Sequence, residues 1–114
     1  WELSTLGDPL ADLAYQLMAW QFPREGGISG LAGLDRTELG LPSDDDYIAA
    51  YCQRTGRSGI DDWPFYMAFC FFRIAAILQG IKKRAQIGTA SSAEADSRAI
   101  MVGPLAALGA ACIP

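Results

Sequence analysis

The carboxylates near the start of the chain are the first side chains that could do chemistry. Asp8 stands between Gly7 and Pro9, and Asp12 follows four residues later. Aspartate before a proline is typical of a helix start, so Asp8 is expected to cap a helix whose first residue is Pro9. Asp12 would then lie one turn further on, beside Leu13 on the apolar face, where a lone carboxylate is costly. Asp12 is therefore a candidate site residue, with an ordinary exposed aspartate as the alternative.

Arg73 is the second candidate. It is the only charged residue in an otherwise apolar and aromatic stretch, residues 63–78. A guanidinium in such a place must pair with a carboxylate or reach water. Pairing with Asp8 or Asp12 is one interpretation. Projection into a pocket that takes an anionic substrate is the other.

The composition excludes several kinds of site. The 114 residues contain no histidine, which removes Ser–His and Cys–His nucleophiles and most zinc and iron sites from these residues alone. Cys52, Cys70 and Cys112 form no C-x-x-C pair and are expected to be free thiols in a reducing, cytoplasmic protein. The acidic run at residues 44–46 could suggest a metal site, but charges at a helix start are far more common. A net charge of −4 argues against a nucleic-acid partner.

Helical spacing dominates the elements that must position these residues, so the expected fold of the chain is all-α. Every long periodic segment is helical, and no sustained two-residue alternation is present. The expected elements are a helix over residues 9–20, an irregular connection over 21–42, a helix from a Ser43 cap to Gly56, and the longest helix from 63 to about 87. A capping box at Ser91 and Glu94 is expected to begin a last helix through residues 99–102. Pro104 should kink or break that helix and leave residues 105–112 weakly anchored.

The longest helix is apolar on nearly every face, which is typical of a buried bundle axis or of a membrane span. A span needs about twenty apolar residues, and Arg73 interrupts this stretch after ten. A buried central helix is therefore favoured, and a membrane partner is not expected. The aromatic side chains of this helix are expected in the core, although some could line a pocket for an apolar acceptor. They are Tyr66, Phe69, Phe71 and Phe72.

Short motifs at the start of the chain resemble a known family. Trp1-Glu2, Gly7-Asp8-Pro9 and Asp12-Leu13-Ala14 match, in order and spacing, a segment of the aminoglycoside phosphotransferase family of kinase-like enzymes. Further matching segments carry the likeness to about Ser92. They are Leu41-Pro42-Ser43, Tyr51-Cys52, Arg73-Ile74-Ala75 and Ile77-Leu78-Gln79-Gly80. The succession is most similar to the kinase-like domain fused to certain acyl-CoA dehydrogenases.

The resemblance implies that residues 1–114 form the helical C-terminal subdomain of a protein-kinase-like α+β fold. It also implies that the N-terminal lobe, the catalytic loop and a magnesium-holding aspartate directly before Trp1 lie outside this sequence. No catalytic residue and no metal ligand is then expected within the chain. The chain alone is expected to be inactive and to bind neither ATP nor Mg²⁺.

For the intact parent, the resemblance implies an ATP- and Mg²⁺-dependent phosphotransferase acting on a hydroxyl of a small molecule, such as a hydroxyacyl-CoA-like or aminoglycoside-like acceptor. Asp12 would accept hydrogen bonds from the backbone of the catalytic loop, and Asp8 would support the same region as a helix cap. Glu2 would lie beside the active site, or else be an exposed carboxylate. Arg73 is a tentative substrate-binding residue. The partners implied are the acceptor and the missing lobe of the same protein.

The alternative function is a non-enzymatic helical interaction module or a degenerate kinase lobe. The residues before Trp1 would discriminate between the two functions. An H-x-D…N loop ending in Asp supports an enzyme, and its absence supports the module.

Overall fold

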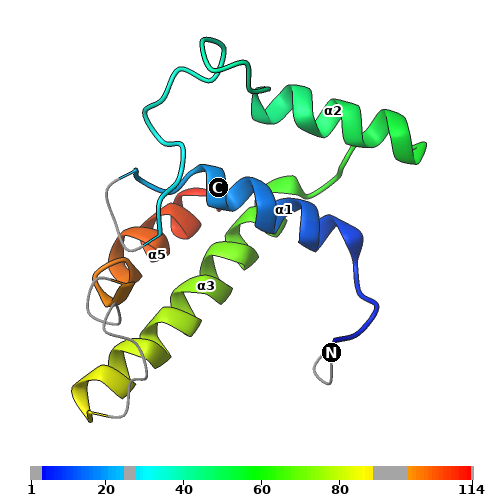
Figure 1. Cartoon of the computed structure of the whole chain (residues 1–114). Helices are drawn as coiled ribbons and strands as arrows, with labels where there is room; N and C mark the ends of the chain where they lie inside the picture. The colour runs from blue at the N-terminus through cyan, green and yellow to red at the C-terminus, as the bar shows by residue number, and fades with distance from the viewer. Residues whose placement is uncertain (1–3, 25–27, 89–97, 114) are drawn as a thin grey trace.

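A computed structural model describes residues 4–24, 28–88 and 98–113 of the chain. The regular elements in these ranges are the helices α1 (Pro9–Trp20), α2 (Asp44–Thr55), α3 (Trp63–Gln86) and α5 (Val102–Ala111), as Figure 1 shows. Extended pairing within the same ranges is limited to an isolated bridge between Pro23 and Ala32. The expectation of an all-α chain is confirmed. The predictions for Glu2 and for the capping box at Ser91 and Glu94 lie outside the described residues.

Helix α1 begins as its sequence predicts. Asp8 is the N-cap, Pro9 is the first helical residue, and the Asp8 Oδ1 accepts a hydrogen bond from the Leu10 N–H at 2.9 Å. One face of the helix is buried, and its residues recur at helical spacing: Leu10, Leu13, Ala14, Leu17 and Met18.

Helix α2 has the predicted ends but lies at the margin of the molecule. The Ser43 Oγ accepts from the Asp46 N–H at 3.1 Å, and Gly56 ends the helix with a left-handed φ of 75°. Of its expected apolar stripe only Cys52 is buried. In Figure 1 α2 is set apart from the pair formed by α3 and α5. Its attachment to α1 includes an edge-to-face contact between Trp20 and Tyr47 with ring centroids 5.0 Å apart.

Helix α3 is the axis of the described fold, but it is covered on one side only. Seven residues are buried and share that side: Met67, Ala68, Cys70, Phe71, Ile74, Ala75 and Leu78. On the other side Phe65 is 67% exposed, Phe69 44% and Phe72 69%. The expectation that Phe69 and Phe72 belong to the core is therefore wrong, whereas Phe71 confirms it. The reason is that α1 and α5 supply packing partners for one face of α3 among the described residues.

By length and composition alone, α3 is the one helix of the described ranges that could cross a membrane. Core helices also satisfy this criterion, so it is weak evidence for a span.

Helix α5 corrects two expectations about the end of the chain. A turn at residues 100–101 separates it from residues 98–99, and Pro104 stands in the first turn of α5. A proline is tolerated there because the first N–H groups of a helix have no intrahelical acceptor. The helix is also firmly anchored, since Leu105 is completely buried and Gly109 packs against Phe71 of α3. The interruption of the helix therefore falls before Pro104, and Leu105 and Gly109 anchor the segment that follows it to the core.

The connection between α1 and α2 is irregular in its described parts, as predicted, but backbone hydrogen bonds hold it. Leu31 N–H donates to the Trp20 carbonyl at 3.1 Å, and Ala32 N–H donates to the Phe22 carbonyl at 3.1 Å. Gly30 is required here, because a Cβ at that position would lie 2.2 Å from the Phe22 carbonyl oxygen. The start of the connection is thus folded back onto the end of α1.

Candidate functional site

The charged candidate site residues Asp8, Asp12 and Arg73 lie at the contact between α1 and α3. Three contacts succeed one another along it. The Tyr66 hydroxyl donates to the Asp8 Oδ2 at 2.5 Å, the Cys70 thiol to the Ala11 carbonyl at 3.6 Å, and the Arg73 guanidinium lies 4.5 Å from the Tyr15 ring centroid. The residue numbers of these contacts rise together on both helices, and α1 crosses over α3 in Figure 1. We call the polar side chains of this contact the polar edge; they are Asp8, Asp12, Tyr15, Tyr66 and Arg73.

Both carboxylate oxygens of Asp8 take part in structural hydrogen bonds. One carboxylate oxygen accepts from the Leu10 N–H and the other from the Tyr66 hydroxyl. The Tyr66 hydrogen bond and then the Leu10 N–H lower the pKa of Asp8, and the same Asp8 bond raises the pKa of Tyr66. Asp8 therefore ties the start of α1 to α3, which confirms its role as a helix cap.

Asp12 is exposed, although the neighbouring Leu13 and Ala14 are buried. The expectation that it lies on the apolar face is wrong, because the burial pattern of α1 turns this position away from the core. In the part of the chain that the structure describes, its carboxylate has no hydrogen bond or ion pair. The carboxylate is accessible to a group from outside these ranges.

Arg73 does not pair with Asp8 or Asp12, contrary to the first interpretation drawn from the sequence. It is half-buried and stacks over Tyr15, and no carboxylate within residues 4–24, 28–88 or 98–113 forms an ion pair with it. Asp8 instead accepts hydrogen bonds from the Leu10 N–H and the Tyr66 hydroxyl. The stacking itself is a cation–π contact, a typical use of arginine beside an aromatic ring.

The thiols are poor candidates for chemistry. Burial raises the pKa of Cys70 and of Cys112, and Cys112 donates to the Leu108 carbonyl at 3.3 Å. Because the thiolate is the reactive form, a raised pKa makes a cysteine a weak nucleophile at neutral pH. Cys52, Cys70 and Cys112 are free thiols, as expected.

The acidic run at the start of α2 has a structural use. Asp44 accepts from the Gln21 side-chain amide at 2.6 Å and forms an ion pair with Arg36 at 2.5 Å. The Arg36 guanidinium also lies over the Trp20 ring, 5.4 Å from its centroid. Asp44 therefore links the irregular connection to α2.

Among the described residues, no group of three Asp, Glu, Cys or His side chains could hold a metal ion. The described residues therefore offer no ready-made cluster of three metal ligands.

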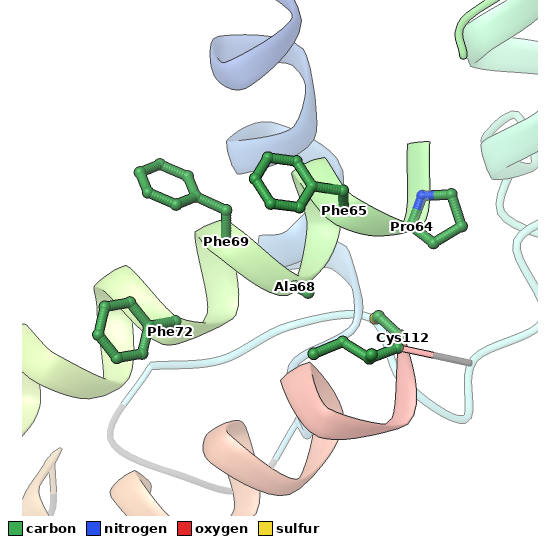
Figure 2. Close-up of a pocket in the computed structure, with 7 residues that line it drawn as sticks. Pro64, Phe65, Ala68, Phe69, Phe72 and Cys112 are labelled. Carbon is green, nitrogen blue, oxygen red and sulfur yellow. The ribbon is translucent and has the colours of Figure 1, made fainter. Parts of the chain in front are cut away.

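An apolar groove lies along the exposed side of α3. The sequence allowed a pocket lined by some of the aromatic side chains of this helix, but it did not indicate which ones. It has a volume of 450 Å³ and is lined by Pro64, Phe65, Ala68, Phe69, Phe72, Cys112 and Ile113. Figure 2 shows the rings of Phe65, Phe69 and Phe72 along α3, with Cys112 at the end of α5. The spacing of the three phenylalanines, four and then three residues, was the available signal for a second apolar face on α3.

Comparisons with known proteins agree with the motifs. No protein-family model matches the chain. Acyl-CoA dehydrogenase family member 10 of Mus musculus is 49% identical over 109 residues, which is 95% of this chain and 10% of that protein. Acyl-CoA dehydrogenase family member 11 of Homo sapiens is 36% identical over 110 residues, 96% of this chain and 14% of that protein.

A crystal structure from Ralstonia eutropha JMP134, provisionally named an aminoglycoside phosphotransferase, has 49% sequence identity to this chain and superimposes with a TM-score of 0.88. The match covers 98% of this chain and 34% of that structure. The chain thus spans about a third of the solved relative and a smaller share of the curated ones. Both parts of the resemblance inferred from the sequence, to the phosphotransferase family and to the acyl-CoA dehydrogenase fusions, are confirmed, as is the helical-subdomain fold.

Proposed function

Because this chain is aminoglycoside phosphotransferase-like in sequence and kinase-like in fold, we propose that the whole protein transfers a phosphoryl group from ATP, with Mg²⁺, to a hydroxyl of a small molecule. The observation that carries the proposal is the superposition of 98% of the chain on the phosphotransferase-like structure at 49% identity. In such reactions the protein acts mainly by positioning the reactants and stabilising charge on the phosphoryl oxygens.

The proposal assigns residues 1–114 to the helical C-terminal part of the domain. No cluster of three metal-ligand side chains occurs among the described residues, and the proposal assigns the magnesium ion and the nucleotide to the N-terminal lobe and the catalytic loop. No step of the reaction is therefore derived through them. The three free cysteines support a reducing, cytoplasmic location, and the proposal includes no nucleic-acid or membrane partner.

The part that this chain would play is to position the catalytic loop and to wall the acceptor pocket. Asp12 is the main candidate for the first task, because its carboxylate is exposed and has no partner within the described ranges. A carboxylate accepts several hydrogen bonds and can hold a turn of backbone N–H groups in one shape. Asp8 would support the same region by fixing the start of α1 against Tyr66.

The test uses the full-length protein that carries this chain. With ATP and Mg²⁺, we expect ADP release that depends on a hydroxylated acceptor, measured across a panel of aminoglycosides, sugars, choline and hydroxyacyl compounds. Asp12→Asn should lower kcat about tenfold or more, since backbone donors would lose a charged acceptor. Asp45→Asn is the matched control, because Asp45 is an exposed aspartate on α2, away from the polar edge.

Two results would refute the proposal. The first is a full-length protein that binds no ATP and releases no ADP with any acceptor, which would favour the non-enzymatic interaction module. The second concerns Asp12 alone. If Asp12→Asn changes neither activity nor stability, its assigned role is wrong even where the phosphotransferase activity is present.

A further inference from the structure

Two charged groups of the polar edge have no hydrogen-bonding or ionic partner among the described residues. They are the carboxylate of Asp12 on α1 and the guanidinium of Arg73 on α3. The other contacts of the same edge are complete, because Asp8 binds Tyr66 and the Cys70 thiol donates to Ala11. The unused acceptor and the unused donors therefore occur together, on the two helices that face each other.

The two groups also lie near one another. Both influence the Cys70 thiol, whose pKa burial raises most; the Arg73 charge opposes that rise and the Asp12 charge adds to it. Even so, they form no ion pair with each other in the described structure. An acceptor on α1 and a set of donors on α3 are thus held in the same contact between the two helices without neutralising each other.

The stacking on Tyr15 fixes how Arg73 can be used. The guanidinium carbon lies over the Tyr15 ring, 4.5 Å from its centroid. This contact leaves the N–H donors without an oxygen acceptor among the described residues, so they can donate to an acceptor from outside these ranges. Tyr15 is three residues after Asp12 on α1, which places donor and acceptor on neighbouring positions of the helix surface.

The pairing of charges selects the kind of partner. A free anion would be attracted by Arg73 but repelled by Asp12. A free cation would be attracted by Asp12 but repelled by Arg73. A segment of polypeptide backbone offers both carbonyl oxygens and N–H groups, and so satisfies both side chains at once.

We propose that Arg73 is a second positioning residue for the phosphotransfer reaction. Its guanidinium donates to main-chain carbonyls of the catalytic loop while Asp12 accepts from N–H groups of the same loop. This inference rests on the proposed function. It replaces the idea that Arg73 binds an anionic substrate, since the loop backbone, and not the acceptor, occupies the guanidinium.

The experiment compares the full-length protein with its variants Arg73→Met, Arg73→Lys and Lys82→Met. Lys82 is an exposed basic residue on the same helix and serves as the matched control. The first measurement is hydrogen–deuterium exchange of backbone amides outside residues 1–114. We expect Arg73→Met to speed exchange about tenfold in one short segment, the same segment that Asp12→Asn loosens, and Lys82→Met to leave it unchanged.

The second measurement is steady-state phosphotransfer. Arg73→Met should lower kcat about tenfold with the KM values for ATP and acceptor unchanged, and Arg73→Lys should recover part of the loss because it keeps the charge without the planar fork. A rise in acceptor KM with normal kcat and normal exchange would overturn the proposal in favour of substrate binding. Unchanged exchange and unchanged kcat would overturn it as well.

The outcomes separate this inference from the proposed function. If the wild-type protein transfers no phosphoryl group, the proposed function fails, and the exchange measurement alone decides whether Arg73 and Asp12 hold a common backbone segment. If Arg73→Met does not fold, Tyr15→Leu provides the same test, because it removes the stacking that orients the guanidinium while leaving the charge. Tyr15→Leu should then speed exchange in the segment that Asp12→Asn loosens, and normal exchange would refute the inference.

Discussion

Gly109 offers a sharp test of how α5 packs on α3. A Cβ at this position would lie 2.9 Å from the Phe71 Cβ and 3.6 Å from the Ala68 carbonyl oxygen. Phe71 is only 2% exposed, so its side chain has no room to withdraw. Gly109→Ala should therefore force the two helices apart, and overpacking of this kind costs about 1–3 kcal/mol.

The opposing effect is the better helix propensity of alanine. It stabilises a helix interior by about 1 kcal/mol relative to glycine. The net result for Gly109→Ala is a loss of about 1 kcal/mol.

Gly80→Ala on α3 is the matched control. The nearest atom to a Cβ there is an Arg84 Nη1 at 3.6 Å, which is an ordinary contact with the end of a flexible side chain. This variant should gain about 1 kcal/mol, so the two alanine variants should differ in unfolding free energy by about 2 kcal/mol.

Urea unfolding of dilute protein, followed by far-UV circular dichroism, measures this difference. With a denaturant dependence of about 2 kcal/mol per molar, Gly109→Ala should lower the midpoint by about 0.5 M and Gly80→Ala should raise it by about the same amount. If both variants are stabilised equally, α5 does not approach α3 as closely as described, and the account of the end of the chain is wrong.

Three further predictions address the core, the helix cap and the thiols. Leu105→Ala should cost about 2–5 kcal/mol of unfolding free energy because Leu105 is completely buried, and the same urea assay would show a negligible shift if α5 were loosely attached. Tyr66→Phe should raise the pKa of Asp8 toward its ordinary value, as followed by NMR titration. The lowered pKa of Asp8 contributes stability that is present above the unfolded-state pKa and is lost as pH falls through the folded-state pKa, so acid should destabilise the wild type more than Tyr66→Phe. Cys70 should react slowly with iodoacetamide in the native protein at neutral pH and rapidly in urea, because burial raises the pKa of its thiol; equal rates would contradict its placement between α1 and α3.

Local signals were sufficient to predict the ends of the helices. Asp8 with Pro9, and Ser43 with Gly56, each determine a helix end through hydrogen bonds and backbone angles within a few residues. Gly88, with a φ of 75°, follows the end of α3 in the same way. These features depend on neighbours in the sequence, which is why the sequence reveals them.

The buried face of α3 could not be predicted in this way. Apolar residues occur on nearly every face of the helix, so their pattern does not indicate which face packs against α1 and α5. Phe71 and Phe72 are adjacent and equally apolar, yet one is 2% and the other 69% exposed. The choice is made by distant segments, and the sequence pattern of α3 alone does not contain them.

The same limit applies to the candidate site. The sequence singled out Asp12 and Arg73 as unusual, but the group that Arg73 contacts lies far from it in the sequence. Tyr66 donates to Asp8 from 58 residues away, and the ring of Tyr15 takes up the guanidinium. The family resemblance predicted a role for Asp12, whereas its exposure is known only from the folded chain.

The contact between α1 and α3 has a consequence for how the chain is synthesised. Their hydrogen bonds join residues 58 and 59 positions apart, so α1 leaves the ribosome well before its partner exists. At about 5–20 residues per second, the delay is roughly 3–12 s, much longer than helix formation itself. Nascent chains stalled before α3 should therefore be cut by protease within α1, and longer ones should be protected there. During synthesis the apolar face of α1, with Leu10, Leu13 and Leu17, is thus exposed and can be bound by a chaperone.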